Sequence, residues 1–166
     1  METKVAIEKK VLSRNDELAE QNRQALQKLD IVTLNFISSP GSGKTSLLEK
    51  TLEKVGEQIS IGLIAGDVQT ENDANRLFQA GGKDVQALVT GGTCHLDAKM
   101  ISGVLPKMPL SRLDLLIIEN VGNLVCPSSY DLGEDMKVVL MSTTEGDDKP
   151  LKYPGIFRRA LSLIHI

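Results

Sequence analysis

The sequence predicts a doubly wound α/β domain with a mostly parallel sheet, helices on both faces of that sheet and an extra N-terminal helix. Three observations predict this fold class. Short runs of β-branched and apolar residues alternate with helical stretches, which is typical of parallel strands joined by crossover helices. A glycine-rich loop at residues 38–45 separates the first such strand from the helix after it. The length, 166 residues, suits a single domain.

The first element is a helix expected over residues 8–29, which contain neither Gly nor Pro. Helical spacing brings four apolar side chains near one face of it: Val11, Leu18, Ala25 and Leu29. We therefore divide the chain into an N-terminal helical extension, residues 1–30, and a phosphate-loop domain, residues 31–166.

Strands and helices alternate through most of the second region. Strands are expected at residues 31–37, 59–65, 85–90, 113–118 and 137–142. Helices are expected at residues 44–55, 73–79 and 95–104. Glycine-containing turns separate several of these elements, so the strands should run parallel with the helices packed against them.

Composition excludes several classes of protein. The net charge is −3 and the chain holds only 3 Phe and 2 Tyr, which disfavours a nucleic-acid binder. Apolar runs such as residues 115–118 are far shorter than the ~20 residues of a membrane span, and the N-terminus lacks the apolar core of a signal peptide. Two cysteines are too few for a disulfide scaffold. We expect a cytoplasmic protein that binds neither nucleic acid nor membrane.

The sharpest motif is SSPGSGKT at residues 38–45, which matches the phosphate-loop pattern except that Ser38 replaces the first glycine. Gly41 and Gly43 allow backbone N–H groups to turn towards phosphate oxygens. Lys44 can neutralise the β- and γ-phosphates, and the Thr45 hydroxyl can ligate Mg²⁺. An ordinary Gly-Ser turn is the alternative, which the strand before the loop and the helix after it disfavour. The expected nucleotide-binding residues are Pro40, Gly41, Ser42, Gly43, Lys44, Thr45, Ser46 and Gly122.

Acidic residues follow two of the predicted strands, where parallel strands present their ligand-binding edge. Glu119 is the candidate Walker B carboxylate, and Asp67 follows the second strand. Asp67 and Asp73 belong to a segment that could close over the nucleotide and orient the attacking water. A helix N-cap is the alternative role for an acidic residue at such a position. We assign catalysis to Lys44, Asp67 and Glu119, and Mg²⁺ binding to Thr45, Asp67 and Glu119.

A second group of candidate ligands comprises Cys94, His95 and Cys126, which follow strands that end at the same edge. Two thiolates and an imidazole suit Zn²⁺ or Ni²⁺. Adjacent Cys and His cannot easily chelate one ion, so the metal could be shared or bridged. Three ligands leave room for water or for a second subunit. Buried structural cysteines are the alternative.

Five segments together resemble the HypB family of hydrogenase nickel-incorporation GTPases. They are NFISSPGSGKTSLLEKT, GDVQTENDANRL, GGTCHLDAKM, LLIIENVGNLVCP and YDLGEDMKVVLMSTTEGDDKPLKYP. The resemblance covers residues 22–157, and SSPGSGKT is the family's own form of the loop. The urease accessory GTPases of the UreG type are the nearest relatives in role, but CHLDA and ENVGNLVCP are more similar to HypB.

The resemblance implies a P-loop domain of the SIMIBI class that binds GTP and Mg²⁺, hydrolyses GTP and dimerises with nucleotide or metal. It implies delivery of nickel to the large-subunit precursor of [NiFe]-hydrogenase together with a HypA-type accessory protein. Cys94, His95 and Cys126 match the family's metal site for Ni²⁺ or Zn²⁺ at the dimer interface. Three alternatives stay open: a urease-type nickel accessory GTPase, a metal-binding module with an inactive nucleotide site, and an ATP-dependent kinase.

Two family features are missing from these 166 residues. There is no N-terminal cysteine motif or histidine-rich stretch, since the chain holds only 2 His. There is also no Asn-Lys-x-Asp, the motif that reads guanine. The resemblance therefore predicts a C-terminally truncated member that lacks the guanine-specificity strand. Such a chain is expected to prefer GTP over ATP only weakly and to be poorly soluble because a sheet edge stays uncovered.

Overall fold

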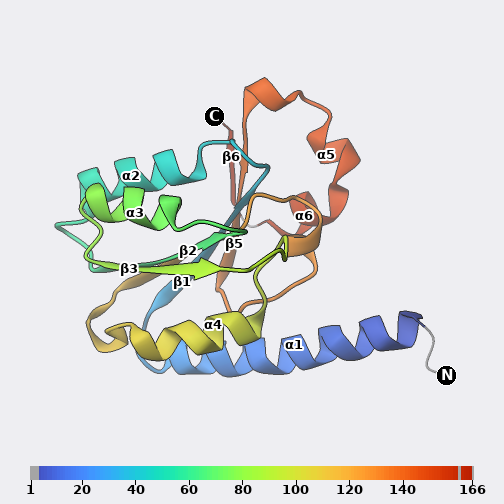
Figure 1. The fold of residues 1–166 in the computed structure, drawn as a ribbon, viewed down its shortest axis with the longest axis horizontal. Coiled ribbons are helices and arrows are strands. Elements are labelled where there is room, and N and C mark those ends of the chain that lie inside the picture. Colours follow the sequence, from blue (N-terminus) through green and yellow to red (C-terminus); the bar gives the residue numbers. More distant parts are fainter. Residues whose placement is uncertain (1–3, 161, 166) are drawn as a thin grey trace.

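A six-stranded parallel sheet forms the centre of the protein, shown in Figure 1 as a computed structural model that describes residues 4–160 and 162–165. The strands lie in the order β3-β2-β4-β1-β5-β6, and every neighbouring pair is parallel. They are β1 Val32–Ser38, β2 Ile61–Asp67, β3 Asp84–Val89, β4 Leu115–Glu119, β5 Met136–Met141 and β6 Ser162–His165. The predicted doubly wound α/β fold is confirmed.

Helices cover both faces of the sheet. They are α1 Lys4–Gln27, α2 Lys44–Val55, α3 Asn72–Gln79, α4 Ala98–Val104, α5 Lys149–Lys152 and α6 Pro154–Arg159. Short 3₁₀ turns lie at Leu105–Lys107, Leu110–Arg112, Cys126–Ser128 and Thr143–Glu145. Helices α2 and α3 pack on one face, whereas α1 and α4 lie side by side on the other (Figure 1). No helix in the described part of the chain is long and apolar enough to cross a membrane.

The core has two main layers, one on each face of the sheet. In β4, Leu116 and Ile118 point into the layer beneath α1 and α4, while Ile117 points into the layer beneath α2 and α3. All three side chains are at most 2% exposed. Burial on both faces explains why the central strands read as unbroken apolar runs rather than as alternating patterns.

The apolar face predicted for α1 is wrong. Val11 is 50% exposed and Leu29, just beyond the helix, is 44% exposed, whereas Ala19 and Leu26 are buried. Leu18 is half-buried, and Ala25 is exposed. The remaining positions on the buried face are Asn15 and Asn22, which are 6% and 4% exposed. A search for apolar periodicity misses this face because two of its four positions carry amides.

Hydrogen bonds make the burial of these two asparagines possible. Asn15 accepts from the Ala98 N–H at 2.9 Å and donates to the Asp131 carbonyl at 2.8 Å. Asn22 donates to the carbonyls of Ala98 and Leu132, at 2.9 and 3.0 Å. Both buried side-chain amides thus donate to backbone carbonyls. The polar face of α1 can therefore replace the expected apolar stripe without leaving these donors unpaired.

Two further differences from the predicted elements affect the site. Helix α4 begins at Ala98 rather than at residue 95, because the Asp97 carboxylate accepts the Met100 N–H at 2.8 Å and caps the helix. Cys94 and His95 therefore lie in a loop. The C-terminal residues, where we expected no strand, include β6, which pairs in parallel with β5. Strand β6 thus covers the edge of β5 and is itself the outermost strand on that side in the described part of the chain, so the expected uncovered edge stays a prediction.

Candidate nucleotide and metal sites

The loop between β1 and α2 has the backbone shape that phosphate binding requires. Gly41 and Gly43 have φ of 75° and 90°, in the left-handed region that favours glycine. Helix α2 begins directly afterwards at Lys44. The loop forms one wall of a cavity of about 380 Å³ at the carboxyl ends of β1, β2 and β4. Its lining includes Pro40, Gly41, Ser42, Gly43, Lys44, Thr45, Ser46, Asp67, Asp73, Arg76, Glu119, Asn120 and Gly122.

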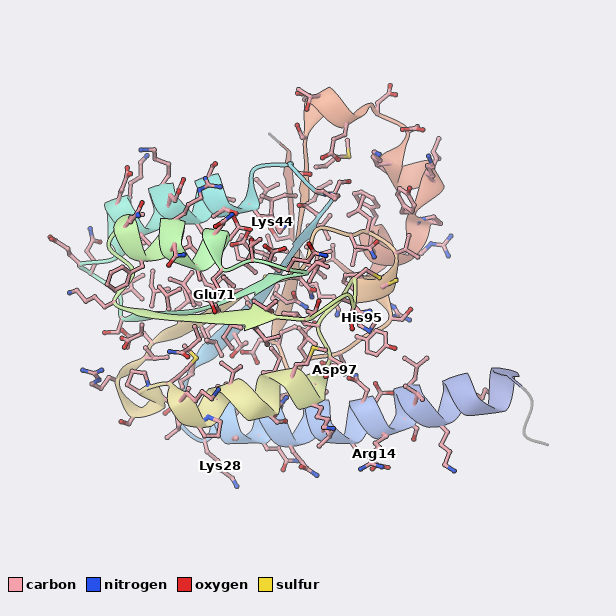
Figure 2. The ribbon with its side chains drawn as sticks, in the orientation of Figure 1. Arg14, Lys28, Lys44, Glu71, His95 and Asp97 are labelled. Carbon is pink, nitrogen blue, oxygen red and sulfur yellow. The ribbon has the colours of Figure 1, made fainter. Side chains whose placement is uncertain are left out.

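Lys44 lies buried at the start of α2, only 8% exposed (Figure 2). Its Nζ donates to the Ser38 hydroxyl at 3.0 Å. Burial lowers the pKa of Lys44, and the nearby carboxylates of Glu119, Asp73 and Glu145 oppose that shift. Ser38, which replaces a glycine of the general pattern, thus holds the ammonium group in the loop.

Glu119 ends β4 and is 2% exposed. Its Oε1 accepts the Thr45 hydroxyl at 2.7 Å, whereas its Oε2 is buried and has no hydrogen-bond partner. Burial raises the pKa of Glu119 to about 7, against the opposing effects of Thr45 and Lys44. A hydroxyl and an unpartnered carboxylate oxygen are the hard donors that Mg²⁺ prefers, so these two residues fit that ion.

We expect Glu119→Gln to stabilise the nucleotide-free chain at pH 8 much more than at pH 5. Above pH 4.5 the unfolded chain ionises this carboxyl, while the folded chain keeps the proton until about pH 7. Folding is therefore disfavoured by about 1.4 kcal/mol for each pH unit between these values, on the order of 3 kcal/mol in all. Urea unfolding of both chains at several pH values measures the difference, with exposed Glu57→Gln as the control. A stability difference that does not change with pH would contradict the raised pKa.

Asp67 and Asp73 both line the cavity, but their carboxylates are engaged locally. Asp67 accepts from the Thr70 hydroxyl and from the Val68 N–H, and these bonds, the Thr70 bond foremost, lower its pKa. Asp73 lies in the first turn of α3 at 3.6 Å from Arg76. Both residues are in reach of the cavity, and their predicted roles in water activation stay predictions.

Gly122 packs tightly against the phosphate loop. A Cβ at this position would lie 2.8 Å from the Pro40 Cα, so any side chain would push the two segments apart. The segment after β4 and the phosphate loop are thus in direct contact.

Two charged residues of the site were missed in the sequence. Arg76 extends from α3 to Glu49 at 2.9 Å and to the Ser46 hydroxyl at 3.0 Å. Glu145 accepts a hydrogen bond from the Ser42 hydroxyl in the phosphate loop, and its second oxygen is buried without a partner. The sequence gives one indication that Arg76 belongs to the site, since this residue lies one helical turn after Asp73. It gives no such indication for Glu145, because the approach of Glu145 to Ser42 depends on the path of the chain after β5.

Cys94, His95 and Cys126 come together at the same end of the sheet. Their ligand atoms all lie within 4.8 Å of one another, and the two sulfur atoms are 3.1 Å apart. The expectation that adjacent Cys94 and His95 cannot easily serve one ion stays a prediction, and this geometry does not favour it. The pair lies in an irregular loop rather than in a helix, and this allows both side chains to turn to one point.

The His95 imidazole has one ring nitrogen that a metal ion could bind. His95 Nδ1 is buried without a hydrogen-bond partner, and the ring stacks on Tyr130 with centroids 4.0 Å apart. Burial lowers the pKa of His95, so the ring is in the neutral form that binds metals. The hydrogen bond with Cys94 raises the pKa of the Cys126 thiol. Two free thiols and an unpartnered nitrogen fit a borderline-soft cation such as Ni²⁺ or Zn²⁺.

The parallel sheet and the phosphate loop define a P-loop nucleotide-binding domain. Residues 32–144 match the nucleotide-binding domain of the CobW/HypB/UreG family. The chain belongs to this family and, within it, to the HypB hydrogenase maturation factors.

Three relatives illustrate the match. HypB of Rhizobium leguminosarum bv. viciae is 49% identical over 156 residues, which cover 94% of this chain and 52% of that protein. The probable HypB of Methanocaldococcus jannaschii is 46% identical over a match that covers 93% of this chain and 69% of that protein. The crystal structure of Helicobacter pylori HypB in complex with nickel superposes with a TM-score of 0.83 at 45% identity, over 90% of this chain and 70% of that one. The chain spans about half the length of several curated relatives.

Proposed function

We propose that this protein is a GTP-hydrolysing metallochaperone that delivers nickel for the maturation of [NiFe]-hydrogenase. The observation that carries the proposal is the segment at residues 119–126, which begins at the buried Glu119 and ends at the ligand Cys126. One short stretch of chain thus belongs to both the nucleotide cavity and the thiol–imidazole cluster. Hydrolysis at one end can change ligand geometry at the other.

The residues of the cavity have distinct tasks in the proposed reaction. Lys44 and the loop N–H groups bind the β- and γ-phosphates and stabilise the charge that develops there. Thr45 and Glu119 hold Mg²⁺, which supplies further positive charge when bound. Asp67 lies at the rim of the cavity, where a carboxylate can orient the attacking water. Gly122 offers its N–H towards the γ-phosphate.

Nickel is the cargo rather than a catalyst in this proposal. Cys94, His95 and Cys126 hold Ni²⁺, or Zn²⁺ in its place, with a free position for a ligand from outside. The proposed partners are a second copy of the chain, a HypA-type accessory protein and the hydrogenase large-subunit precursor, in the cytoplasm.

Phosphate release from GTP, measured with and without Mg²⁺, tests the enzymatic half of the proposal. We expect release that depends on Mg²⁺, because Thr45 and Glu119 together present the hydroxyl and carboxylate oxygens that this ion prefers.

Sedimentation with GTP and Ni²⁺ or Zn²⁺ tests the metal-binding half of the proposal, and a nucleotide- or metal-promoted dimer is expected. Metal binding without phosphate release under any condition would favour a metal-binding module and contradict the proposal.

A further inference from the structure

Two asparagines hold the backbone of the loop that carries His95. Asn120 Oδ1 accepts the N–H of Leu96 at 3.3 Å, and Asn123 Nδ2 donates to the carbonyl of Cys94 at 3.1 Å. The two bonds lie on either side of His95, one residue before it and one after it. Both asparagines belong to the segment at residues 119–126, whereas Cys94 and His95 belong to the loop after β3.

Asn120 is fixed to the strand that leads into the phosphate loop. Its side chain is 1% exposed, and its Nδ2 donates to Asn35 Oδ1 on β1 at 3.1 Å. Its backbone N–H donates to the Phe36 carbonyl at 2.9 Å. Asn35 in turn donates to the buried Glu134 at 3.2 Å. A buried polar chain therefore links β1, the end of β4 and the His95 loop.

Asn123 fixes the other end of the segment. It is partly exposed, and its Oδ1 accepts the Val125 N–H at 2.9 Å, one residue before the ligand Cys126. The same side chain thus contacts the backbone of Cys94 and orders the turn that presents Cys126. Asn120 makes a corresponding pair of bonds, because its Oδ1 accepts the N–H groups of both Leu96 and Val121.

We propose that Asn120 and Asn123 are positioning residues that clamp the Cys94–Leu96 backbone to residues 119–126, so that nucleotide state sets the metal affinity of all three ligands together. This inference rests on the proposed function. Gly122 lies between the two asparagines and contacts Pro40 of the phosphate loop, so a change at the phosphates reaches the clamp directly. Without the clamp, Cys126 would move alone, while Cys94 and His95 would stay with β3.

Asn123→Asp is the variant that tests the clamp. It keeps the acceptor for Val125 N–H but replaces the donor to the Cys94 carbonyl with a second acceptor, so that bond is lost. Gln58→Glu is the matched control, since Gln58 also donates to a backbone carbonyl, at 3.5 Å, but lies before β2 at the opposite end of the sheet. Asn123→Ala serves as a second variant without the added charge.

The measurement is the ratio of the Ni²⁺ dissociation constants in the presence of GDP and of a non-hydrolysable GTP analogue. We expect this ratio to differ from one by about 5-fold or more in the parent and in Gln58→Glu, and to fall below about 2-fold in both Asn123 variants. The Ni²⁺–thiolate absorption and the affinity for nucleotide should stay unchanged. A general effect of the new charge on Ni²⁺ affinity would change both dissociation constants alike and would therefore cancel in their ratio.

Two results would overturn the clamp. One is an unchanged ratio in both Asn123 variants. The other is a parent that hydrolyses GTP and binds Ni²⁺ with the same affinity in both nucleotide states, which leaves the proposed function standing. A parent that neither hydrolyses GTP nor binds Ni²⁺ would instead overturn the proposed function, and the clamp with it.

Discussion

Lys44→Ala is expected to lower phosphate release from GTP by about 100-fold or more while leaving Ni²⁺ binding intact. The ammonium group is buried at the start of α2 and is held there by Ser38. A single preorganised charge or donor at a transition state commonly accounts for about 100- to 1,000-fold in rate. The metal ligands lie on other loops, so their affinity for Ni²⁺ should not depend on Lys44.

Lys50→Ala is the matched control, because Lys50 lies on the same helix but is exposed and pairs with Glu53 on the surface. Phosphate release is followed for the parent and both variants at saturating GTP and Mg²⁺, and Ni²⁺ binding is titrated in parallel. Hydrolysis by Lys44→Ala at the parental rate would remove the phosphate-loop assignment.

The double variant Cys94→Ala, Cys126→Ala is expected to bind Ni²⁺ at this site about 100-fold more weakly or not at all, while still binding nucleotide. Removal of both thiolates leaves only the His95 imidazole, and even outer-shell changes at metal sites commonly cost about 10- to 100-fold in affinity. Isothermal titration with Ni²⁺ measures the effect. Ser129→Ala, an exposed change three residues after Cys126, serves as the control. A titration that matches the parent would identify both cysteines as ordinary packing residues.

Motifs with strict chemical requirements were readable from the sequence. Phosphate binding needs glycines and a lysine at fixed spacing, so SSPGSGKT could be placed between a strand and a helix without a structure. Parallel strands place their carboxyl ends together, so Glu119 and the loop could be expected at one edge. The structure places these residues around one cavity, although their roles in catalysis stay predictions.

Features that depend on tertiary contacts were not readable. The approach of Glu145 to Ser42 follows from the path of the chain after β5, and that path has no local pattern. The buried face of α1 was missed because hydropathy treats Asn15 and Asn22 as surface residues, whereas in the fold they meet the backbone groups of Ala98 and Asp131. The short strand β6 was missed because its neighbour β5 supplies the pairing.

The buried asparagines of α1 fix the position of this helix along its own axis. A smooth apolar stripe tolerates sliding, but a slide of one turn, ~5.4 Å, would separate Asn15 and Asn22 from Ala98, the residue that opens α4. Each buried amide left unpaired costs about 1–3 kcal/mol, so other registers are strongly disfavoured. The two asparagines therefore also fix the position of Leu12, three residues before Asn15. Leu12 lines a second cavity, of about 390 Å³, together with His95 and Tyr130.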